Sequence, residues 1–345
     1  VATASGTAAI ATTLMVILRT GDHIVASSSL YGGTYNLLAN TLPRFGITTT
    51  FVDPDNPNEF TKAVKSNTRV FFAESLGNPK LDVIDLKSIS DASKKAKVPF
   101  IVDNTVASPA LLNPIEHGAN IVIHSLTKYL TGNGTSIGGV IIDAGTFDWA
   151  NGNFPEFTEP NPSYHGLNYH EALGNIAFIA KVRIEGLRDL GSAPSPFNSF
   201  QSIQGIETLD IRMKKHSENA LKLAAWLSTK EEVAWVNYPG LKTSKYNTLA
   251  QKYLPNGQSG IVTFGLKKGF EAGKKVADHT QLFSLLANIG DTKSLIIHPA
   301  STTHQQLNEE AQKSTGVTQD LIRLSVGLED IKDLIDDLDS AFKHI

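Results

Sequence analysis

Two residues with chemically useful side chains follow short apolar segments of this chain. Asp103 lies in the segment FIVDN (100–104), and Lys128 comes three residues after the segment NIVIHS (120–125). In open sheets of parallel strands, ligands bind beyond the carboxyl ends of the strands, so both side chains are expected at one edge. Burial there would lower the pKa of the lysine and free its lone pair for Schiff-base formation. A Ser-x-x-Lys sequence alone, however, is typical of a solvated loop lysine.

A second set of residues has the pattern of a phosphate site. The tripeptide Ser5-Gly6-Thr7 opens an apolar segment with helical spacing (7–19), and Ser125 and Thr127 add hydroxyl groups after a predicted strand. Backbone N–H groups converge at a helix start, and together with the helix dipole they suit an anion. Taken alone, the tripeptide has a simpler interpretation as an ordinary helix cap.

The combination is more specific than any of its members. Tyr31 also falls at a predicted strand-to-helix junction. Pyridoxal 5′-phosphate needs a lysine for its Schiff base, a carboxylate to keep its ring nitrogen protonated, an anion site for its phosphate and an aromatic face for its ring. Lys128, Asp103, the phosphate-type residues and Tyr31 meet these needs. The residues therefore predict this cofactor, which serves as an electron sink.

The elements expected to position these residues alternate between strand and helix. Strand patterns occur at 23–27, 47–52, 69–75, 100–104, 120–125 and 138–143. Helical patterns occur at 7–19, 34–42, 59–66 and 85–98. The alternation predicts an α/β fold with a large, mostly parallel sheet. A stretch rich in Pro and Asn, 151–163, is expected to be a long loop.

The C-terminal part of the chain has a different pattern. A long amphipathic helix is predicted at 208–229. Further strands are predicted at 233–238, 260–266 and 320–328, and further helices at 271–287 and 328–345. We therefore divide the chain into a cofactor-binding large domain, 1–205, and a smaller α+β domain, 206–345, which the long linking helix begins.

Composition excludes several classes of protein. The 345 residues are 41% apolar and 19% charged, with a net charge of −3, so neither disorder nor binding to nucleic acid or a membrane surface is indicated. No residue is cysteine, and no apolar stretch reaches the roughly 20 residues that span a bilayer. We expect a cytoplasmic enzyme that acts on small molecules.

No metal site is predicted either. The chain has pairs of neighbouring histidines, but none has metal-site spacing and no cysteine assists them. The pairs are His117 with His124, His165 with His170, and His298 with His304. We interpret these histidines as surface or hydrogen-bonded residues.

Six motifs resemble those of one enzyme family. They are SGTAAI, YGGTYNLL, ESLGNP, IVDNTVASP, HSLTKYLTGNG and DLIRLSVGLEDIKDLI. Together they resemble the Cys/Met-metabolism branch of fold-type I pyridoxal-phosphate enzymes, and the similarity covers essentially the whole chain. The resemblance implies an aspartate aminotransferase-like fold with a large sheet domain and a smaller C-terminal α+β domain.

The resemblance also implies a role for individual residues. Lys128 would form the Schiff base, Asp103 would pair with the ring nitrogen, and Tyr31 would stack on the ring and assist proton transfer. The other cofactor contacts would come from Ser5, Gly6, Thr7, Glu74, Asn78, Ser125 and Thr127. Most of these would hold the phosphate, whereas Asn78 would reach the 3-oxygen of the cofactor and Glu74 would stand in an outer layer.

Two further segments narrow the resemblance to the O-acetylhomoserine sulfhydrylases of the family. They are GNIAFIAKVRIEGLRDLGSAPSPFNSFQSIQGIETLDIRM and LFSLLANIGDTKSLIIHPASTTHQQL. Ala287 stands where cystathionine lyases tend to have Glu, and Asn288 where many relatives have Ser at the substrate carboxylate. Arg323 would bind that carboxylate with its two-pronged donor geometry. The implied reaction is a γ-replacement in methionine biosynthesis that converts O-acetyl-L-homoserine and sulfide to L-homocysteine and acetate.

The same residues and motifs are also compatible with other functions. Methionine γ-lyase shares every step up to γ-elimination, and a cystathionine γ-synthase or lyase is a further alternative. A more distant alternative is a non-catalytic relative that serves as a binding or scaffold subunit, against which the complete cofactor set argues.

The resemblance finally implies a homotetramer built as a dimer of dimers. In the family, an N-terminal segment supplies a Tyr and an Arg to the phosphate of a neighbouring subunit. Here the first motif begins at Ser5, so we expect that an N-terminal segment is missing from this sequence.

Overall fold

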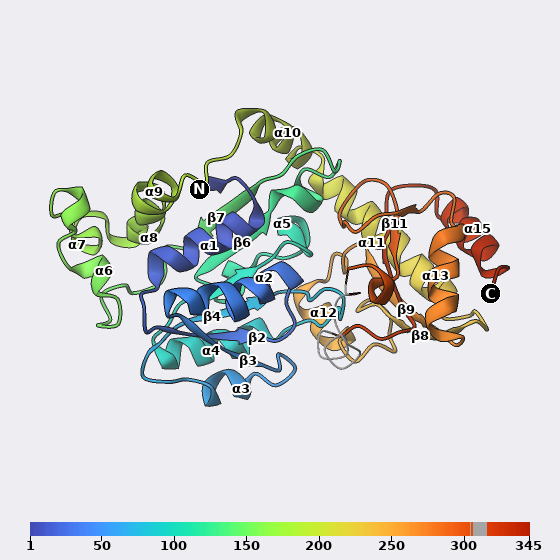
Figure 1. Cartoon of the computed structure of the whole chain (residues 1–345), viewed down its shortest axis with the longest axis horizontal. Helices are drawn as coiled ribbons and strands as arrows, with labels where there is room; N and C mark the ends of the chain where they lie inside the picture. Colours follow the sequence, from blue (N-terminus) through green and yellow to red (C-terminus); the bar gives the residue numbers. More distant parts are fainter. Residues whose placement is uncertain (304, 306–315) are drawn as a thin grey trace.

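The computed structural model describes residues 1–303, 305 and 316–345, and these residues form two lobes that lie side by side (Figure 1). One lobe is built on a sheet in the order β1-β7-β6-β5-β4-β2-β3, the other on a sheet in the order β10-β11-β12-β9-β8. Helix α11 (Leu209–Leu227) runs between them. The α/β class and the two sheet-containing units agree with the prediction.

The larger sheet is mostly parallel, as predicted. Its strands are β1 (Ala2–Thr3), β2 (His23–Ser27), β3 (Thr48–Val52), β4 (Thr68–Glu74), β5 (Phe100–Asp103), β6 (Ile121–Ser125) and β7 (Gly139–Asp143). Strands β2 to β6 pair in parallel, whereas β7 is antiparallel to both β6 and β1. The carboxyl ends of β4, β5 and β6 therefore meet at one edge.

Successive residues of these strands face opposite sides, and both sides are buried. Phe71 and Val102 belong to one apolar cluster, whereas Phe72 and Ile101 belong to a second cluster on the other face. This explains the short apolar runs, because a strand covered on both faces has no polar side. Helix α4 (Leu86–Ala96) covers the first face, and α1 (Gly6–Ile17) covers the second.

Several predicted boundaries in the large lobe change: the predicted helix at 59–66 ends at Lys62, and two other stretches differ more in kind. The predicted helix at 34–42 begins at Gly32, as α2 (Gly32–Asn36), and continues through a π-helical turn and a 3₁₀ turn to Phe45. The stretch 151–163, predicted as a loop, contains α6 (Pro155–Thr158) and the start of a 3₁₀ turn (Pro162–Tyr164). Aromatic packing holds this stretch, since the Trp149 and Phe157 rings stack with their centroids 4.2 Å apart.

Two of the remaining helices of the large lobe connect strands of the sheet, and the other four lie between β7 and the linking helix. They are α3 (Asn58–Lys62), α5 (Ser108–Leu111), α7 (Tyr169–Leu173), α8 (Ala177–Lys181), α9 (Arg188–Leu190) and α10 (Pro196–Ile206). Figure 1 shows α10 at the rim of the molecule, above the place where the two lobes meet.

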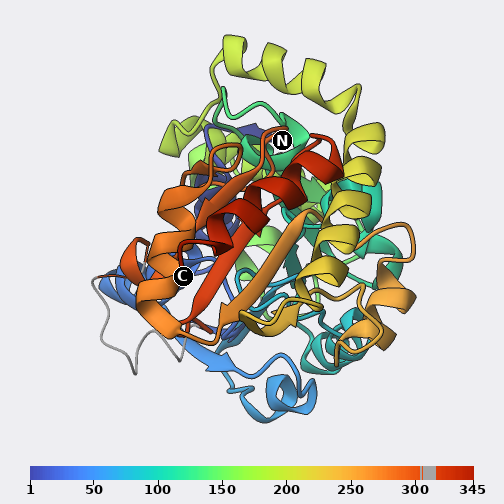
Figure 2. The same ribbon diagram turned by 90° about the vertical axis from the view of Figure 1, so that its right-hand side faces the viewer.

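The smaller sheet contains three predicted strands and two that the sequence analysis missed. The predicted strands are β8 (Val233–Asn237), β9 (Ile261–Leu266) and β12 (Leu321–Ser325). The missed strands are β10 (Ser284–Leu285) and β11 (Leu295–Ile297). Helices α13 (Gly269–His279) and α15 (Ile331–Phe342) lie across the sheet in Figure 2.

The prediction of one helix over 271–287 is wrong beyond His279, where α13 ends. The Asp337 carboxylate accepts hydrogen bonds from the backbone N–H groups of Gln281, Leu282 and Phe283 at 2.8, 2.9 and 3.0 Å. These donors are thereby held by a distant side chain, which leaves the chain free to turn into β10. A local apolar pattern cannot reveal such a partner.

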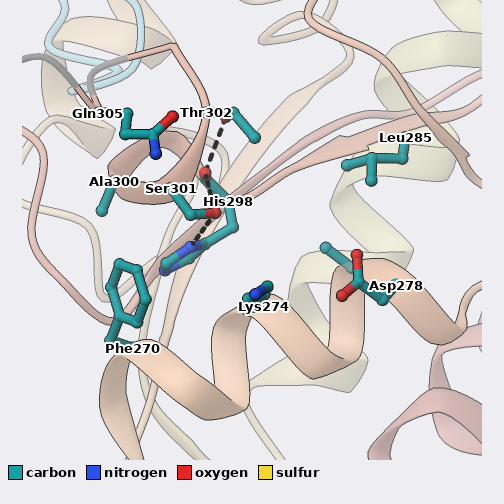
Figure 3. Close-up of a pocket in the computed structure, with 10 residues that line it drawn as sticks. Phe270, Lys274, Asp278, Leu285, His298, Ala300, Ser301, Thr302 and Gln305 are labelled. Carbon is teal, nitrogen blue, oxygen red and sulfur yellow. Dashed lines mark hydrogen bonds between the residues drawn. The ribbon is translucent and has the colours of Figure 1, made fainter.

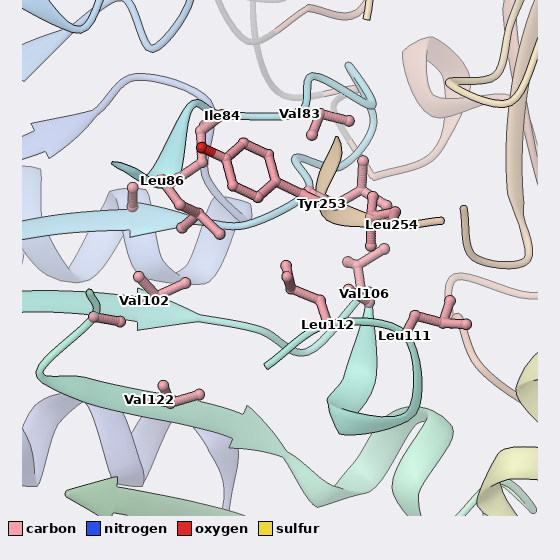
Figure 4. Packing of buried hydrophobic residues seen from close by; sticks show 14 of the residues in the cluster. Val83, Ile84, Leu86, Val102, Val106, Leu111, Leu112, Val122, Tyr253 and Leu254 are labelled. Atoms are coloured by element: carbon pink, nitrogen blue, oxygen red, sulfur yellow. The ribbon is translucent and has the colours of Figure 1, made fainter. Parts of the chain in front are cut away.

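One segment after residue 206 packs into the core of the large lobe. Helix α12 (Asn247–Tyr253) places Tyr253 near Val83, Ile84 and Leu86 (Figure 4). We therefore keep a domain boundary near 206 as a proposal, with this segment as an anchor between the lobes.

Among the described residues, no helix is long and apolar enough to cross a membrane.

Candidate active site

Three polar side chains stand where β4, β5 and β6 end. Glu74 and Asp103 are register partners on neighbouring strands, and Ser125 ends the next strand. The hydroxyl of Thr105 ties these ends together, because it donates to Asp103 Oδ1 at 2.5 Å and accepts from the Ser125 N–H at 2.8 Å. The predicted carboxylate and the predicted phosphate residue are thus joined through one hydroxyl group.

Asp103 has two donors and a raised pKa. Thr105 donates to its Oδ1 from the backbone N–H at 3.0 Å as well as from the hydroxyl. Burial raises the pKa of Asp103 to about 6, although both hydrogen bonds oppose the shift. Asp103 is therefore mostly ionised at neutral pH.

Lys128 lies in a distorted π-helical turn, Leu126–Leu130, which directly follows β6. The backbone of Lys128 has φ −94° and ψ −130°. Its Nζ donates to Asn288 Oδ1 at 2.5 Å. Burial, assisted by the charge of Arg323, lowers the pKa of Lys128 to about 8. Roughly a tenth of the amine is then neutral at pH 7, against a negligible fraction for an ordinary lysine.

The loop that carries Asn288 is packed against the lysine turn. A Cβ atom on Gly290, which has φ +75°, would lie 2.6 Å from the backbone nitrogen of Tyr129. Only a glycine permits this approach. The loop comes from the smaller lobe, so the contact between Lys128 and Asn288 joins the two lobes at the site.

Arg323 projects from β12 toward the same place. Its Nη2 donates to the backbone oxygen of Asn288 at 3.1 Å, and its Nη1 donates to Asn78 Oδ1 at 3.3 Å. Burial lowers the pKa of Arg323 to about 10. Its buried Nε has no hydrogen-bond partner among the described residues, and such an orphaned donor suits an anionic ligand.

The predicted phosphate residues converge at the start of α1. Ser5 Oγ accepts from the Ala8 N–H at 3.0 Å, so the helix-cap interpretation of Ser5 is confirmed. Gly6 lies directly against the end of β6, because a Cβ atom on it would be 2.7 Å from Ser125 Cβ. The first-turn N–H groups of Gly6 and Thr7 have no acceptor within the helix. These donors and the Ser125 hydroxyl form one anion-binding corner.

The other predicted residues have partners of their own. Thr127 Oγ1 exchanges hydrogen bonds of 3.3 and 3.2 Å with the backbone of Gly138. Tyr31 is 54% exposed at the start of α2, and its backbone N–H donates to Glu74 Oε1 at 2.5 Å. The structure therefore brings every predicted site residue to the region where the large sheet ends and the two lobes meet.

A scan against protein-family models matches residues 1–343 to the Cys/Met metabolism PLP-dependent enzymes. This chain belongs to that family. The family depends on pyridoxal 5′-phosphate, so this is the cofactor of the chain.

Three relatives place the chain more closely within the Cys/Met metabolism family. It is 56% identical to the O-acetyl-L-homoserine sulfhydrylase of Leptospira meyeri over its full length, which covers 80% of that protein. It is 48% identical to the homocysteine synthase of Schizosaccharomyces pombe, with 99% of this chain and 81% of the relative covered. A protein described as an O-acetylhomoserine (thiol)-lyase of Campylobacter jejuni, solved with a pyridoxyl-lysine, matches with a TM-score of 0.96 and 43% identity over 99% of this chain and 82% of its own.

The residues of the site fit the family's cofactor. The anion-binding corner formed by Gly6, Thr7 and Ser125 suits a phosphate group, and the ionised Asp103 suits a protonated ring nitrogen. The neutral fraction of Lys128 suits attack on an aldehyde, because only the unprotonated amine has a free lone pair.

Sequence reasoning missed one residue that holds the lysine turn in place. The buried Arg212, on α11, donates to the carbonyl oxygens of Tyr129 and Gly205 at 2.6 and 2.7 Å, and to that of Leu130 at 3.2 Å. It thereby fixes the turn that contains Lys128 to the helix between the lobes. An arginine in the middle of an amphipathic helix gives no local signal of such a role.

One cavity lies away from these residues. A cavity of about 270 Å³ in the smaller lobe is lined by Phe270, Lys274 and His298 among others, and none of its lining residues is a predicted site residue (Figure 3).

Both ring nitrogens of His298 have partners, Ser301 Oγ and Gln319 O, each at 2.9 Å. This histidine is thus hydrogen-bonded, as predicted, whereas His304 lies outside the described residues. No group of three metal-ligating side chains occurs in the described part of the chain.

Replacing Gly6 with Ala tests the anion-binding corner. The new Cβ would overlap Ser125, so α1 must move away, and we expect cofactor affinity to fall at least about tenfold. The measurement is the dissociation constant of pyridoxal 5′-phosphate by titration of the cofactor-free protein. Gly32→Ala is the matched control, because a Cβ atom there has nothing within 4 Å. Equal affinities of the two variants would contradict the assignment.

A second prediction concerns the pH dependence of cofactor binding. The Asp103 carboxylate stabilises a cationic ring nitrogen above its pKa of about 6, and this stabilisation is lost as the pH falls through that value. We expect wild-type affinity to decline from pH 7.5 to pH 5. Asp103→Asn should bind about 10- to 100-fold more weakly at pH 7.5, as the loss of a charged hydrogen bond implies, with a flatter pH profile. Parallel profiles of the two proteins would exclude this role.

Proposed function

We propose that this enzyme replaces the acetoxy group on the γ-carbon of O-acetyl-L-homoserine by sulfide, producing L-homocysteine and acetate. The observation that carries the proposal is the 56% identity, over the full chain, to an O-acetyl-L-homoserine sulfhydrylase. The family resemblance of Ala287 and Asn288 supports it, because Ala287 stands where cystathionine lyases tend to have Glu, and Asn288 where many relatives have Ser. We also propose that the reaction belongs to methionine biosynthesis in the cytoplasm.

In this proposal, the residues around the lysine hold the cofactor. Lys128 would bind its aldehyde carbon, Asp103 would keep its ring nitrogen protonated, Tyr31 would stack on its ring and Asn78 would bind its 3-oxygen. The phosphate contacts would come from Ser5, Gly6, Thr7, Ser125 and Thr127. When bound, pyridoxal 5′-phosphate supplies an electron sink that stabilises negative charge on the substrate.

Lys128 then serves as the base and acid of the reaction. Its lowered pKa, about 8, allows the neutral amine to take the proton from the substrate α-carbon at physiological pH and to return a proton later. The hydrogen bond to Asn288 Oδ1 orients the amine. Tyr31 is exposed at the same edge and assists these transfers.

Arg323 and Asn288 bind the amino-acid end of the substrate. The unpartnered Nε of Arg323 supplies a donor for the α-carboxylate, and Nη2 is already fixed by the Asn288 carbonyl. A guanidinium held at one edge keeps a fixed orientation, and its planar fork then suits a carboxylate.

A substrate panel tests the reaction. We expect homocysteine release from O-acetylhomoserine plus sulfide, and Lys128→Ala should abolish turnover. After borohydride reduction, mass spectrometry should locate the pyridoxyl group on Lys128. Release of 2-oxobutyrate from methionine, without homocysteine from the first mixture, would instead identify a methionine γ-lyase. An adduct on another lysine would refute the site.

We also propose a homotetramer built as a dimer of dimers, with α10 in a contact between copies. Five large apolar side chains at the end of the large lobe are 45 to 74% exposed. They are Phe197, Phe200, Ile203, Ile206 and Ile211. An isolated chain would leave these side chains of α10 and the start of α11 in water, so a second copy is the occupant that we propose.

Phe200→Asp tests this contact. A carboxylate placed in an apolar interface loses its hydration, so we expect the variant to elute as a smaller species in size-exclusion chromatography with light scattering. Phe45→Asp is the control, because Phe45 is similarly exposed, at 51%, on another part of the lobe. A wild-type monomer, or an unchanged mass for Phe200→Asp, would contradict the proposed contact.

A further inference from the structure

Glu74 occupies a central place in the site without an evident chemical task. It is the last residue of β4 and only 5% exposed. Its register partner on β5 is Asp103, and neighbouring strands lie about 4.8 Å apart with side chains of register partners on the same face. Its Oε1 accepts the backbone N–H of Tyr31 at 2.5 Å. Glu74 therefore connects the residue proposed to stack on the cofactor with the residue proposed to bind its ring nitrogen.

Two carboxyl groups in this position cannot both ionise at low cost. Like charges so close together, away from water, favour a shared single charge. The ionised form is better stabilised at Asp103, because Asp103 accepts two hydrogen bonds from Thr105, whereas Glu74 accepts one from Tyr31. No lysine or arginine among the described residues forms an ion pair with either group.

A third carboxyl group adds to this asymmetry. Asp82 is also buried, accepts the Ser29 hydroxyl at 2.6 Å, and lies near enough for its charge to act on Glu74. Its nearest cation, Lys80, is itself paired with Asp53 and Asp55. Burial and the charge of Asp103, with a smaller effect of Asp82, raise the pKa of Glu74 well above its usual range.

We propose that Glu74 is a positioning residue that works as a neutral carboxylic acid. It holds the Tyr31 backbone beside the cofactor ring through its carbonyl oxygen, and it leaves Asp103 as the single negative charge beneath the ring nitrogen. This inference rests on the roles of Asp103 and Tyr31 in the proposed function. The pair then has one proton, on Glu74, and one negative charge, on Asp103.

The variant Glu74→Gln separates this role from a charged one. Glutamine is neutral and keeps the oxygen that accepts from Tyr31. We expect the holoenzyme of Glu74→Gln to retain the cofactor dissociation constant within about twofold, and the pH titration of its cofactor absorption band within about 0.3 pH unit. Glu74→Ala loses the acceptor, so its cofactor affinity should fall about tenfold, as for one lost hydrogen bond.

Infrared difference spectroscopy of the holoenzyme provides a readout independent of activity. We expect the carbonyl stretch of a protonated carboxylic acid in the wild type at neutral pH, and its loss in Glu74→Gln. Asp82→Asn is the matched control, because it removes another buried carboxyl group that contacts Ser29 instead of Tyr31. It should leave the cofactor affinity and the absorption titration unchanged.

Stability gives a second readout with a definite sign. A raised folded-state pKa means that the folded protein retains a proton that the unfolded chain releases above the ordinary value of 4.5. The wild type should therefore lose stability relative to Glu74→Gln as the pH rises above that value. The melting temperature of the wild-type holoenzyme should fall relative to that of the Glu74→Gln holoenzyme between pH 5 and pH 8.

The opposite results would overturn the inference. If Glu74 were ionised, Glu74→Gln would shift the cofactor titration by more than about one pH unit, because a charge one strand away would be removed. A cofactor affinity of Glu74→Gln as low as that of Glu74→Ala would likewise exclude the neutral-acid role. Failure of the proposed function is distinct: the wild type would then release no homocysteine, whatever the spectra of the variants.

Discussion

Loss of hydration at the carboxyl edge of the large sheet is the constraint on which this site depends. It lowers the pKa values of Lys128 and Arg323 and raises those of Asp103 and Glu74. An exposed lysine would be fully protonated at neutral pH, and an exposed carboxylate would bind a ring nitrogen only weakly. The same residues on a solvated surface would therefore have little of the chemistry proposed here.

The dry edge exists only because both lobes contribute to it. The large lobe supplies Lys128 and Asp103, whereas the smaller lobe supplies Asn288 and Arg323 from a loop and from β12. Arg212 on the linking helix caps carbonyl groups of the lysine turn, and α12 is anchored in the core of the large lobe. Relative movement of the lobes would thus change the hydration of the lysine directly.

The strand-and-helix alternation of the first 143 residues was sufficient to predict the large sheet, because strands buried on both faces leave short apolar runs in the sequence. The reversed direction of β7 was not visible in that pattern. The errors fall where distant partners replace local hydrogen bonds. Asp337 ends the helical conformation after His279, and aromatic packing shapes the stretch predicted as a loop. The three missed strands, β1, β10 and β11, have only two or three residues each and are too short to form a period.

By itself, the sequence determined which chemical groups are present and in what order along the strands. A lysine, a carboxylate, an anion-binding turn and an aromatic ring at strand ends were enough to predict the cofactor, and the motifs were enough to predict the family. Tertiary structure alone decided how these groups are protonated and paired. The contact of Lys128 with Asn288 joins residues that are 160 positions apart. The single charge proposed for the Glu74–Asp103 pair depends on burial by many segments. Protonation follows from the surroundings of a group, and no local stretch of sequence contains them.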